Sequence, residues 1–328
     1  MGLDSLKKNS FLVVGRAGLD LYAEPPGTCM EDAEHFYATV GGSAANIAVG
    51  IVRQGGQAAL LTCVSDDAVG RSTIKKLKDF GVETSTVRAV GGEARNSLAV
   101  VETRHENCQS VIYRNGAADF EFRTSDVKHT SFEAFGCLII TGTCLALEPS
   151  RSATLLAIAK AKVAGLTVVM DIDHRPYSWA SADEAKKHYN NAAKACDIVI
   201  GNDDEFSVMA GRDKAAGLKL ARHFAKTFAQ IVIYKMGERG SITISKDDEF
   251  ETPIFSVKAL KPTGAGDAFM AGFITSLSMG HGIGDCVKQG SAAAAMVVCG
   301  VGCAPAMPTS SELKMFIANH ANNIEQRH

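Results

Sequence analysis

The chain has 328 residues, 46% of them hydrophobic, and its 34 Lys and Arg nearly balance its 36 Asp and Glu. This size and composition can support a large buried core. Acidic and basic residues are mixed along the chain, which excludes a strongly basic surface for nucleic acid or an anionic membrane. The nine cysteines contain no C-x-x-C pair, and residues 1–14 contain no long apolar segment, so we expect reduced thiols in a cytoplasmic protein.

Short β-rich apolar runs alternate with helix-like segments along most of the chain. The predicted strands cover residues 11–14, 58–64, 138–141, 167–171, 197–200 and 231–234. The predicted helices cover residues 45–54, 69–80, 150–164, 183–195, 215–228, 265–279 and 283–298. This alternation predicts an α/β fold in which helices cover both faces of a parallel sheet.

Two segments, about 17–40 and 86–122, interrupt the alternation because strand-like pieces follow one another there without helices. We interpret them as a small β-sheet lid inserted discontinuously into a single domain of residues 1–328. A lid beside a parallel sheet predicts a substrate that is enclosed on closure. Its strand edges would also permit a homodimer formed through the lid.

The segment Gly264-Ala265-Gly266-Asp267 precedes an apolar helical run. Backbone amides at a helix start bind anions, and small residues let a phosphate approach closely. An aspartate in the first turn could accept a proton from an attacking hydroxyl. The alternative is a structural glycine turn whose acid complements the helix dipole. Neither a Walker A loop nor a complete G-x-G-x-x-G pattern is present.

Three residues are candidates for binding a hydroxyl-rich ligand. Gly42 opens another predicted helix, and Asn46 lies one turn into it with both a donor and an acceptor. Asp20 follows the first strand, where open α/β sheets bind ligands. The structural alternatives are a tightly packed helix start and a surface acid.

Other polar residues follow two later strands. Asn202 and Glu205 are one helical turn apart and could orient Mg²⁺ and its waters, although helix capping would use the same pair. Lys235, Gly237 and Gly240 form a turn against which a nucleotide could lie, although glycine hairpins look similar.

Arg114 and Arg175 are candidates for binding a ligand carboxylate. The first leaves the predicted lid, and the second follows the strand that ends at residue 171. A guanidinium pairs with a carboxylate through two parallel hydrogen bonds. The alternative for each is a structural salt bridge.

Four motifs occur in one order along residues 11–310: Gly41-Gly42 with Asn46, Asn202-x-x-Glu205, Gly237 with Gly240, and residues 263–267. This order resembles the ribokinase, or PfkB-type, family of carbohydrate kinases. The resemblance implies ATP and Mg²⁺ as cosubstrates, Asp267 as the general base and the amides of residues 264–266 as an anion hole. It further implies that Asp20, Gly42 and Asn46 face the sugar, that Asn202 and Glu205 serve the metal-phosphate region, and that Lys235, Gly237 and Gly240 line the nucleotide.

Residues 15–22, 93–101, 111–119 and 261–267 resemble the branch of this family that phosphorylates a keto sugar acid of inositol catabolism. Kinases of 2-keto-3-deoxygluconate and some fructokinases resemble these stretches too, so the acceptor is left open. A catalytically idle sugar-acid sensor is a third alternative, against which the intact loop and Asp267 argue.

The chain departs from the family pattern at two positions. Many members carry Asp-Thr ahead of the loop, in a region that helps to hold a monovalent cation, where this chain has Lys261-Pro262. A requirement for a monovalent cation is therefore left open. Ser291 stands where ribokinases place an asparagine at the adenine, so adenine contacts are not carried over.

Overall fold

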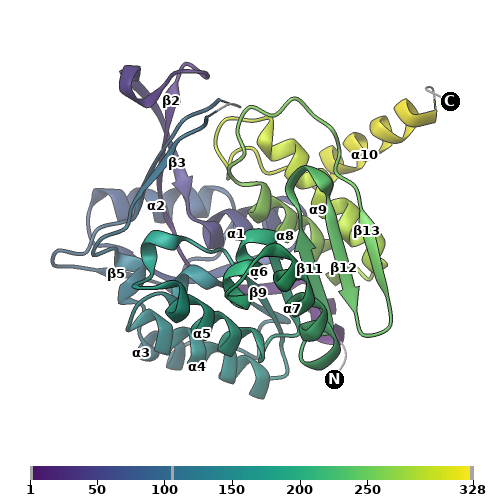
Figure 1. Ribbon diagram of the computed structural model, residues 1–328. Coiled ribbons are helices and arrows are strands. Elements are labelled where there is room, and N and C mark those ends of the chain that lie inside the picture. Colours follow the sequence, from purple (N-terminus) through teal and green to yellow (C-terminus); the bar gives the residue numbers. More distant parts are fainter. Residues whose placement is uncertain (1–2, 105–106, 326–328) are drawn as a thin grey trace.

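The computed structural model describes residues 3–104 and 107–325, with side chains up to residue 320. Its main element is a nine-stranded sheet in the order β13-β12-β11-β10-β9-β8-β1-β4-β5 (Figure 1). Seven strands are parallel: β1 (Ser10–Val14), β4 (Gln57–Ser65), β5 (Val87–Val90), β8 (Cys137–Thr141), β9 (Thr167–Asp171), β10 (Ile198–Asn202) and β11 (Ile231–Lys235). The hairpin of β12 (Ser241–Ser245) and β13 (Glu249–Thr252) adds two antiparallel strands.

Helices cover both faces of this sheet because its central strands are apolar on both sides. In β1, Leu12 and Val14 join one buried cluster, whereas Phe11 and Val13 join the other. The first cluster includes residues of α3 (Thr124–Lys128), α4 (Ser150–Val163), α5 (Ala182–Ala193), α6 (Asp203–Ala210) and α7 (Lys214–Thr227). The second includes residues of α1 (Ser43–Arg53), α2 (Ala68–Asp79), α8 (Ala265–Ser278), α9 (Ile283–Val298) and α10 (Ser310–Glu325). The predicted α/β fold is confirmed.

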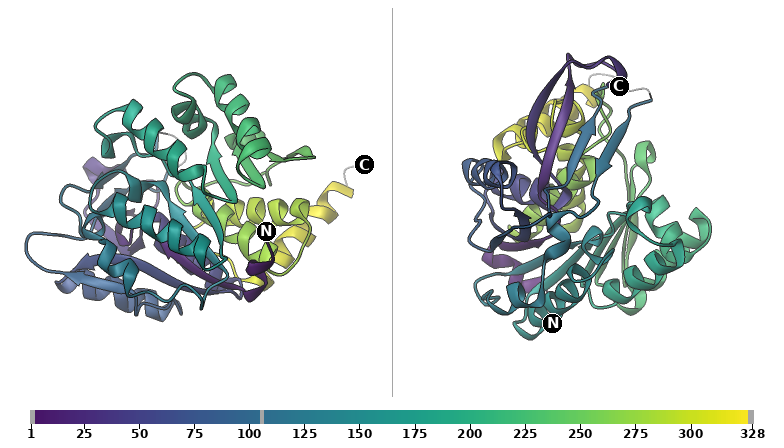
Figure 2. Two further views of the ribbon diagram at one scale, coloured as in Figure 1. Left: turned by 90° about the horizontal axis from the view of Figure 1, so that it is seen from below. Right: turned by 90° about the vertical axis from the view of Figure 1, so that its left-hand side faces the viewer.

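A second sheet of four strands stands off the main body, as Figure 2 shows in its right-hand view. Its order is β3-β2-β6-β7, with β2 (Gly18–Glu24), β3 (His35–Gly41), β6 (Leu98–Val101) and β7 (Ser110–Tyr113). Strands β2 and β6 are parallel, and the other two pairs are antiparallel. The predicted small second sheet is therefore present.

The second predicted lid segment, 86–122, is longer than the part of it that joins this sheet. Strand β5 pairs with β4 in the large sheet instead, since Val87 and Val90 pack against opposite core clusters. Ala117, Phe120 and Phe122 also belong to the main core. Among the described residues of the segment, only β6 and β7 contribute strands to the lid.

The parallel strands place their carboxyl ends at one edge of the sheet, next to the base of the lid. Asn46 of α1 and Asp267 of α8 are hydrogen bonded there, and Ser43 of α1 and Thr143, after β8, both bind Asp173, after β9. Segments far apart in the sequence therefore meet at a position where α/β sheets bind ligands. Within the described ranges, no helix combines the length and apolarity needed to cross a membrane.

Candidate active site

The start of α8 has the geometry of an anion site. Gly264 precedes the helix with φ 87°, and a Cβ there would lie 2.6 Å from Cys303 Sγ, so the position requires glycine. The first helical hydrogen bond runs from Ala268 N to Gly264 O (3.0 Å). The preceding amides, those of residues 265–267, lack intrahelical acceptors and present their N–H groups to the space above the helix.

Asp267 lies in this first turn and accepts a hydrogen bond from Asn46 Nδ2 at 2.8 Å. Loss of contact with bulk water raises the pKa of Asp267 to about 7, and the nearby charge of Asp173 adds to that increase. The hydrogen bond from Asn46 and the charges of Arg175 and Arg16 oppose it. A carboxyl group with a pKa near neutrality is suited to accept a proton from an attacking hydroxyl.

Asp173 is the second carboxylate of the site, and the sequence analysis did not identify it. Burial favours its protonated form, but Arg175 and the hydrogen bond from Ser43 lower its pKa below the usual value. Arg175 Nη2 lies 2.9 Å from Asp173 Oδ1, and Thr143 Oγ1 donates to Oδ2 at 3.2 Å. Asp173 also has a left-handed backbone with φ 39°. It therefore stays ionised beside Asp267.

The double glycine Gly41-Gly42 lets the lid strand approach the helix start. A Cβ on Gly41 would lie 1.8 Å from Asp20 Oδ1, and one on Gly42, where φ is 100°, would lie 2.3 Å from Arg16 O. Asp20 accepts a hydrogen bond from Tyr22 at 3.2 Å, and burial raises the pKa of Asp20. The sequence identified Gly42, Asp20 and Asn46, and the structure brings them to one place.

Three buried polar atoms at this place have no hydrogen-bond partner within the described chain. They are Asp20 Oδ1, Asn46 Oδ1 and Thr263 Oγ1. Buried polar groups in folded proteins are nearly always paired. Their arrangement fits a polar ligand with several hydroxyl groups.

Arg16 is a cationic residue of the site that sequence reasoning missed. Its side chain is 8% exposed, and Nη1 donates to Ser97 Oγ at 3.1 Å. Among the described residues, no carboxylate oxygen lies within 4.0 Å of its guanidinium. Its charge nevertheless acts on Asp20, Asp173 and Asp267. The sequence feature that could have identified Arg16 is its position two residues after the end of β1.

The two arginines predicted from the sequence both form salt bridges. Arg114 is buried, donates to Asp119 and to Thr143 O (3.2 Å), and stacks on Phe120 at 4.0 Å. Arg175 pairs with Asp173, but its side chain is 39% exposed. Arg175 therefore keeps an open side for a ligand, whereas the guanidinium of Arg114 is held by the protein.

Asn202 and Glu205 form a capping box at the start of α6. Glu205 N donates to Asn202 Oδ1 (2.9 Å), and Asn202 N donates to Glu205 Oε2 (2.7 Å). The other oxygen, Oε1, accepts from His174 N at 3.0 Å. Both carboxylate oxygens of Glu205 thus bind backbone amides, and hydration water of a metal would have to use their remaining lone pairs.

Lys235 lies at the end of β11, beside the start of α8. A Cβ built on Gly266 would lie 3.4 Å from Lys235 Nζ, so the ammonium faces the anion site. Asp171, at the end of β9, has its pKa raised to about 8 by burial, with Lys235 opposing the shift. Asp171 was also missed by sequence reasoning.

Gly237 begins the short 3₁₀ turn Gly237–Arg239 that follows β11, and Gly240 comes directly after this turn. Both have positive φ, 59° and 83°. A Cβ on Gly240 would lie 2.1 Å from Thr252 O, whereas the space beside Gly237 is open. Gly240 is thus required by the hairpin, and Gly237 leaves a free surface next to Lys235.

A model of the pfkB family of carbohydrate kinases matches residues 8–310. The chain belongs to this family. It is 40% identical over 320 residues to the 5-dehydro-2-deoxygluconokinase of Photobacterium profundum, covering 95% of this chain and 96% of that protein. Its identity to the enzyme of the same name from Geobacillus kaustophilus is 37%, covering 99% and 98% of the two chains.

Solved structures agree with this assignment. A fructokinase from Vibrio cholerae with fructose, ADP and potassium ion bound is 27% identical, with a TM-score of 0.82 and coverage of 94% and 97% of the two chains. A putative ribokinase II from E. coli in complex with ATP and Mg²⁺ has a TM-score of 0.84 at 18% identity, covering 95% of this chain and 99% of that one, which shows the shared fold alone. The predicted family membership and kinase class are confirmed.

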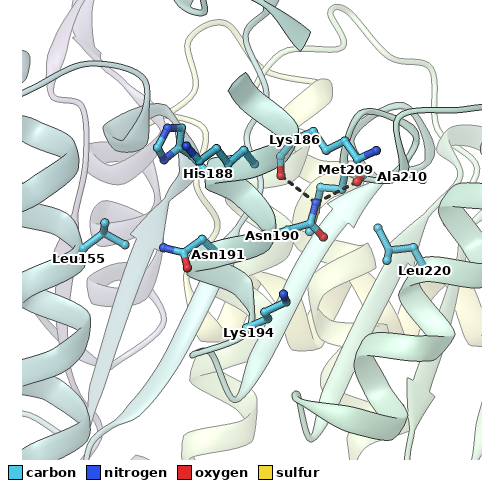
Figure 3. A pocket seen from close by; sticks show the side chains of 10 residues that line it. Leu155, Lys186, His188, Asn190, Asn191, Lys194, Met209, Ala210 and Leu220 are labelled. Carbon is cyan, nitrogen blue, oxygen red and sulfur yellow. Dashed lines mark hydrogen bonds between the residues drawn. The ribbon is translucent and has the colours of Figure 1, made fainter. Parts of the chain in front are cut away.

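A separate surface hollow lies between α4, α5, α6 and α7 (Figure 3). Asn190 closes part of it by donating to Lys186 O (2.7 Å) and Met209 O (2.9 Å). None of its lining residues belongs to the set around Asp267. The hollow is therefore separate from the polar edge beneath the lid.

The pKa of about 7 for Asp267 predicts an acidic limb in the activity profile. Because a base must be ionised to accept a proton, kcat/KM should fall about tenfold per pH unit below roughly pH 7. Initial rates between pH 5.5 and 8.5 at constant ionic strength measure this. The Asp171→Asn variant should keep the limb, which separates Asp267 from its neighbour. A flat profile over this range would contradict the assignment.

Proposed function

We propose that this kinase transfers the γ-phosphoryl group of ATP to a hydroxyl of a keto sugar acid, 5-dehydro-2-deoxy-D-gluconate, to give its 6-phosphate in inositol catabolism. The observation that carries the reaction class is the Asp267 carboxyl group, which has a pKa of about 7, at an anion-binding helix start. The names of the relatives that match nearly the full length support the substrate. The unpaired thiols of the nine cysteines support the predicted cytoplasmic location.

In the proposed mechanism, Asp20, Gly42 and Asn46 hold the sugar hydroxyls, and Asp267 removes the proton of the attacking hydroxyl. The amides of Gly264, Ala265 and Gly266 would receive the transferred phosphoryl group, with Lys235 beside them. Negative charge that develops during transfer would therefore meet fixed donors.

The nucleotide would lie along the turn from Lys235 to Gly240, where the surface beside Gly237 is open. Asn202 and Glu205 would hold Mg²⁺ through its waters. When bound, the metal ion would neutralise charge on the phosphates. The capping box fixes both side chains in place for that task.

Two arginines near the proposed sugar-binding residues support an acid as the substrate. Arg16 has no carboxylate partner among the described residues, and Arg175 has an exposed side. We propose that these two receive the substrate carboxylate and that Arg114, fixed by Asp119, contributes from the lid side. Of the alternative acceptors, fructose lacks this charge, whereas 2-keto-3-deoxygluconate also carries a C1 carboxylate and differs in the position of its keto group.

Replacing the base tests the reaction class. We expect Asp267→Asn to lower kcat by roughly 10²–10⁴-fold, the usual contribution of a general base, while MgADP binding persists. Because the pKa of Asp267 is raised from 3.8 to about 7, this residue lowers the stability of the fold progressively as the pH rises through that range, and the full cost is present at pH 8. The variant should therefore melt at the same or a higher temperature at pH 8. Wild-type kcat in this variant would contradict the proposal, whereas a wild-type chain that binds sugar acids but releases no ADP would indicate the idle sensor.

We call the three arginines proposed to bind the substrate carboxylate the carboxylate clamp. The variants Arg16→Gln, Arg114→Gln and Arg175→Gln test it. We expect kcat/KM for the acid to fall by on the order of 10²-fold, since truncating one partner of a buried charge pair costs about 2–5 kcal/mol. Activity with fructose should fall much less, because fructose has no carboxylate. Arg212→Gln, which changes an exposed arginine, is the matched control. Unchanged preference for the acid in all three variants would reject the clamp.

We propose that the kinase forms a homodimer through its lid. The edge strands β3 and β7 carry exposed apolar side chains, with Tyr37 40% and Tyr113 59% accessible. Exposed edge strands with large apolar residues favour pairing with another chain.

Light scattering on the purified chain tests the dimer. The double variant Tyr37→Lys with Tyr113→Lys should shift the mass from dimer to monomer, because two buried charges would then face the partner. Val163→Lys, at an exposed site outside the lid, is the control and should remain dimeric. A monomeric wild-type chain at micromolar concentration would contradict this arrangement.

A further inference from the structure

Lys261 is a fully buried lysine that the proposed mechanism does not use. Its side chain is among the largest completely buried ones, with 0% exposure. No carboxylate oxygen lies within 4.0 Å of its ammonium among the residues that the structure describes. Burying an ammonium without a counterion is costly, so its presence calls for a specific role.

The ammonium of Lys261 binds backbone carbonyls instead of a carboxylate. It donates to Thr263 O at 2.8 Å and to Val297 O at 3.4 Å, with Cys303 Sγ at 3.8 Å. Val297 lies in the last turn of α9, where the helix dipole places partial negative charge. The ring of Tyr22 completes the surroundings, 6.0 Å away. Lys261 therefore connects the loop before α8 to the end of α9.

The contact with Thr263 O has a geometric consequence for the anion site. In a planar trans peptide the C=O and the following N–H point in opposite directions. Because Lys261 holds the carbonyl of Thr263, the amide N–H of Gly264 is fixed on the side away from the ammonium. Gly264 is the residue that opens α8 and its anion site. The orientation of this amide thus depends on Lys261.

We propose that Lys261 is a built-in cation that positions the peptide between Thr263 and Gly264 for phosphoryl transfer, an inference that rests on the proposed kinase function. A dissociable monovalent cation at this place would need the same carbonyl oxygens. The ammonium already binds those of Thr263 and Val297 and would repel a second cation. The chain therefore does not fit a monovalent cation beside residue 261, and the kinase should need none there.

The variant Lys261→Met tests this role because Met has a similar shape without charge. We expect kcat to fall roughly tenfold or more, since losing one donor to a transition-state anion costs on the order of 10²–10³-fold. KM for the acid should change little, and the melting temperature should stay equal or rise because a buried unpaired charge is removed. Lys288→Met, on the exposed side of α9, is the control and should change neither. A wild-type kcat in Lys261→Met, or a loss of kcat that follows a lower melting temperature, would overturn the inference.

Chemical rescue provides a second measurement. In Lys261→Ala, KCl or methylammonium chloride should raise kcat above its value in choline chloride at the same ionic strength, whereas the wild-type chain should not respond. Activation of the wild-type chain by potassium to the same degree would overturn the inference.

A binding measurement separates this inference from the proposed substrate. By calorimetry, Lys261→Met should bind MgADP with aluminium fluoride, a mimic of the transferred phosphoryl group, at least about tenfold more weakly than the wild-type chain, while MgADP alone binds equally. This readout needs no acceptor. Failure of the wild-type chain to phosphorylate any sugar acid would reject the proposed function, whereas equal binding of the mimic by both chains would reject the role of Lys261 alone.

Discussion

The carboxyl group of Asp267 lies at the start of α8 beside a second carboxylate, Asp173, in a place that is poorly hydrated. Two like charges that interact in such a place favour protonation of one of them. The arrangement makes Asp173 the ionised partner, because Arg175, Ser43 and Thr143 all bind it. Asp267 has Asn46 as its hydrogen-bond partner and is therefore the group that exchanges protons near neutrality. The helix starts and strand ends around it serve to maintain this difference.

Several residues around this pair have unusual backbone conformations or environments. Asp173 adopts a left-handed backbone, Gly42 and Gly264 have positive φ with no room for a side chain, and Lys261 is buried without a counterion. Positive φ without room for a side chain also occurs elsewhere, as at Gly240, where a hairpin requires it. Local violations of this kind concentrate at functional sites, where geometry is selected over stability. Their concentration around Asp267 supports this edge of the sheet as the candidate site.

Much of the fold could be predicted from the sequence because apolar runs and helical composition are local signals. The pairing of β5 with β4 in the large sheet could not be predicted, because it depends on the core clusters against which Val87 and Val90 pack. In the site, Asp267, Asn46 and Asp20 were found because each belongs to a glycine-rich or strand-end pattern. Asp173, Asp171 and Arg16 were missed because their importance comes from neighbours distant in the sequence. The same limit applies to Arg114, whose pairing with Asp119 only the folded chain reveals.

The two arginines proposed to bind the substrate carboxylate, Arg16 and Arg175, also affect the protonation of Asp267. Arg16 and Arg175 both lower the pKa of Asp267, whereas the negative charge of a substrate carboxylate would raise it. In the proposed arrangement, these two arginines would compensate most of the charge of a bound acid, and Asp267 could then stay ionised when the phosphates bind. Loss of Arg16 would remove one of the charges that lower the pKa of Asp267. In the proposed site, recognition of the acid and ionisation of the base would thus depend on the same two arginines, which follow β1 and β9 at one edge of the sheet.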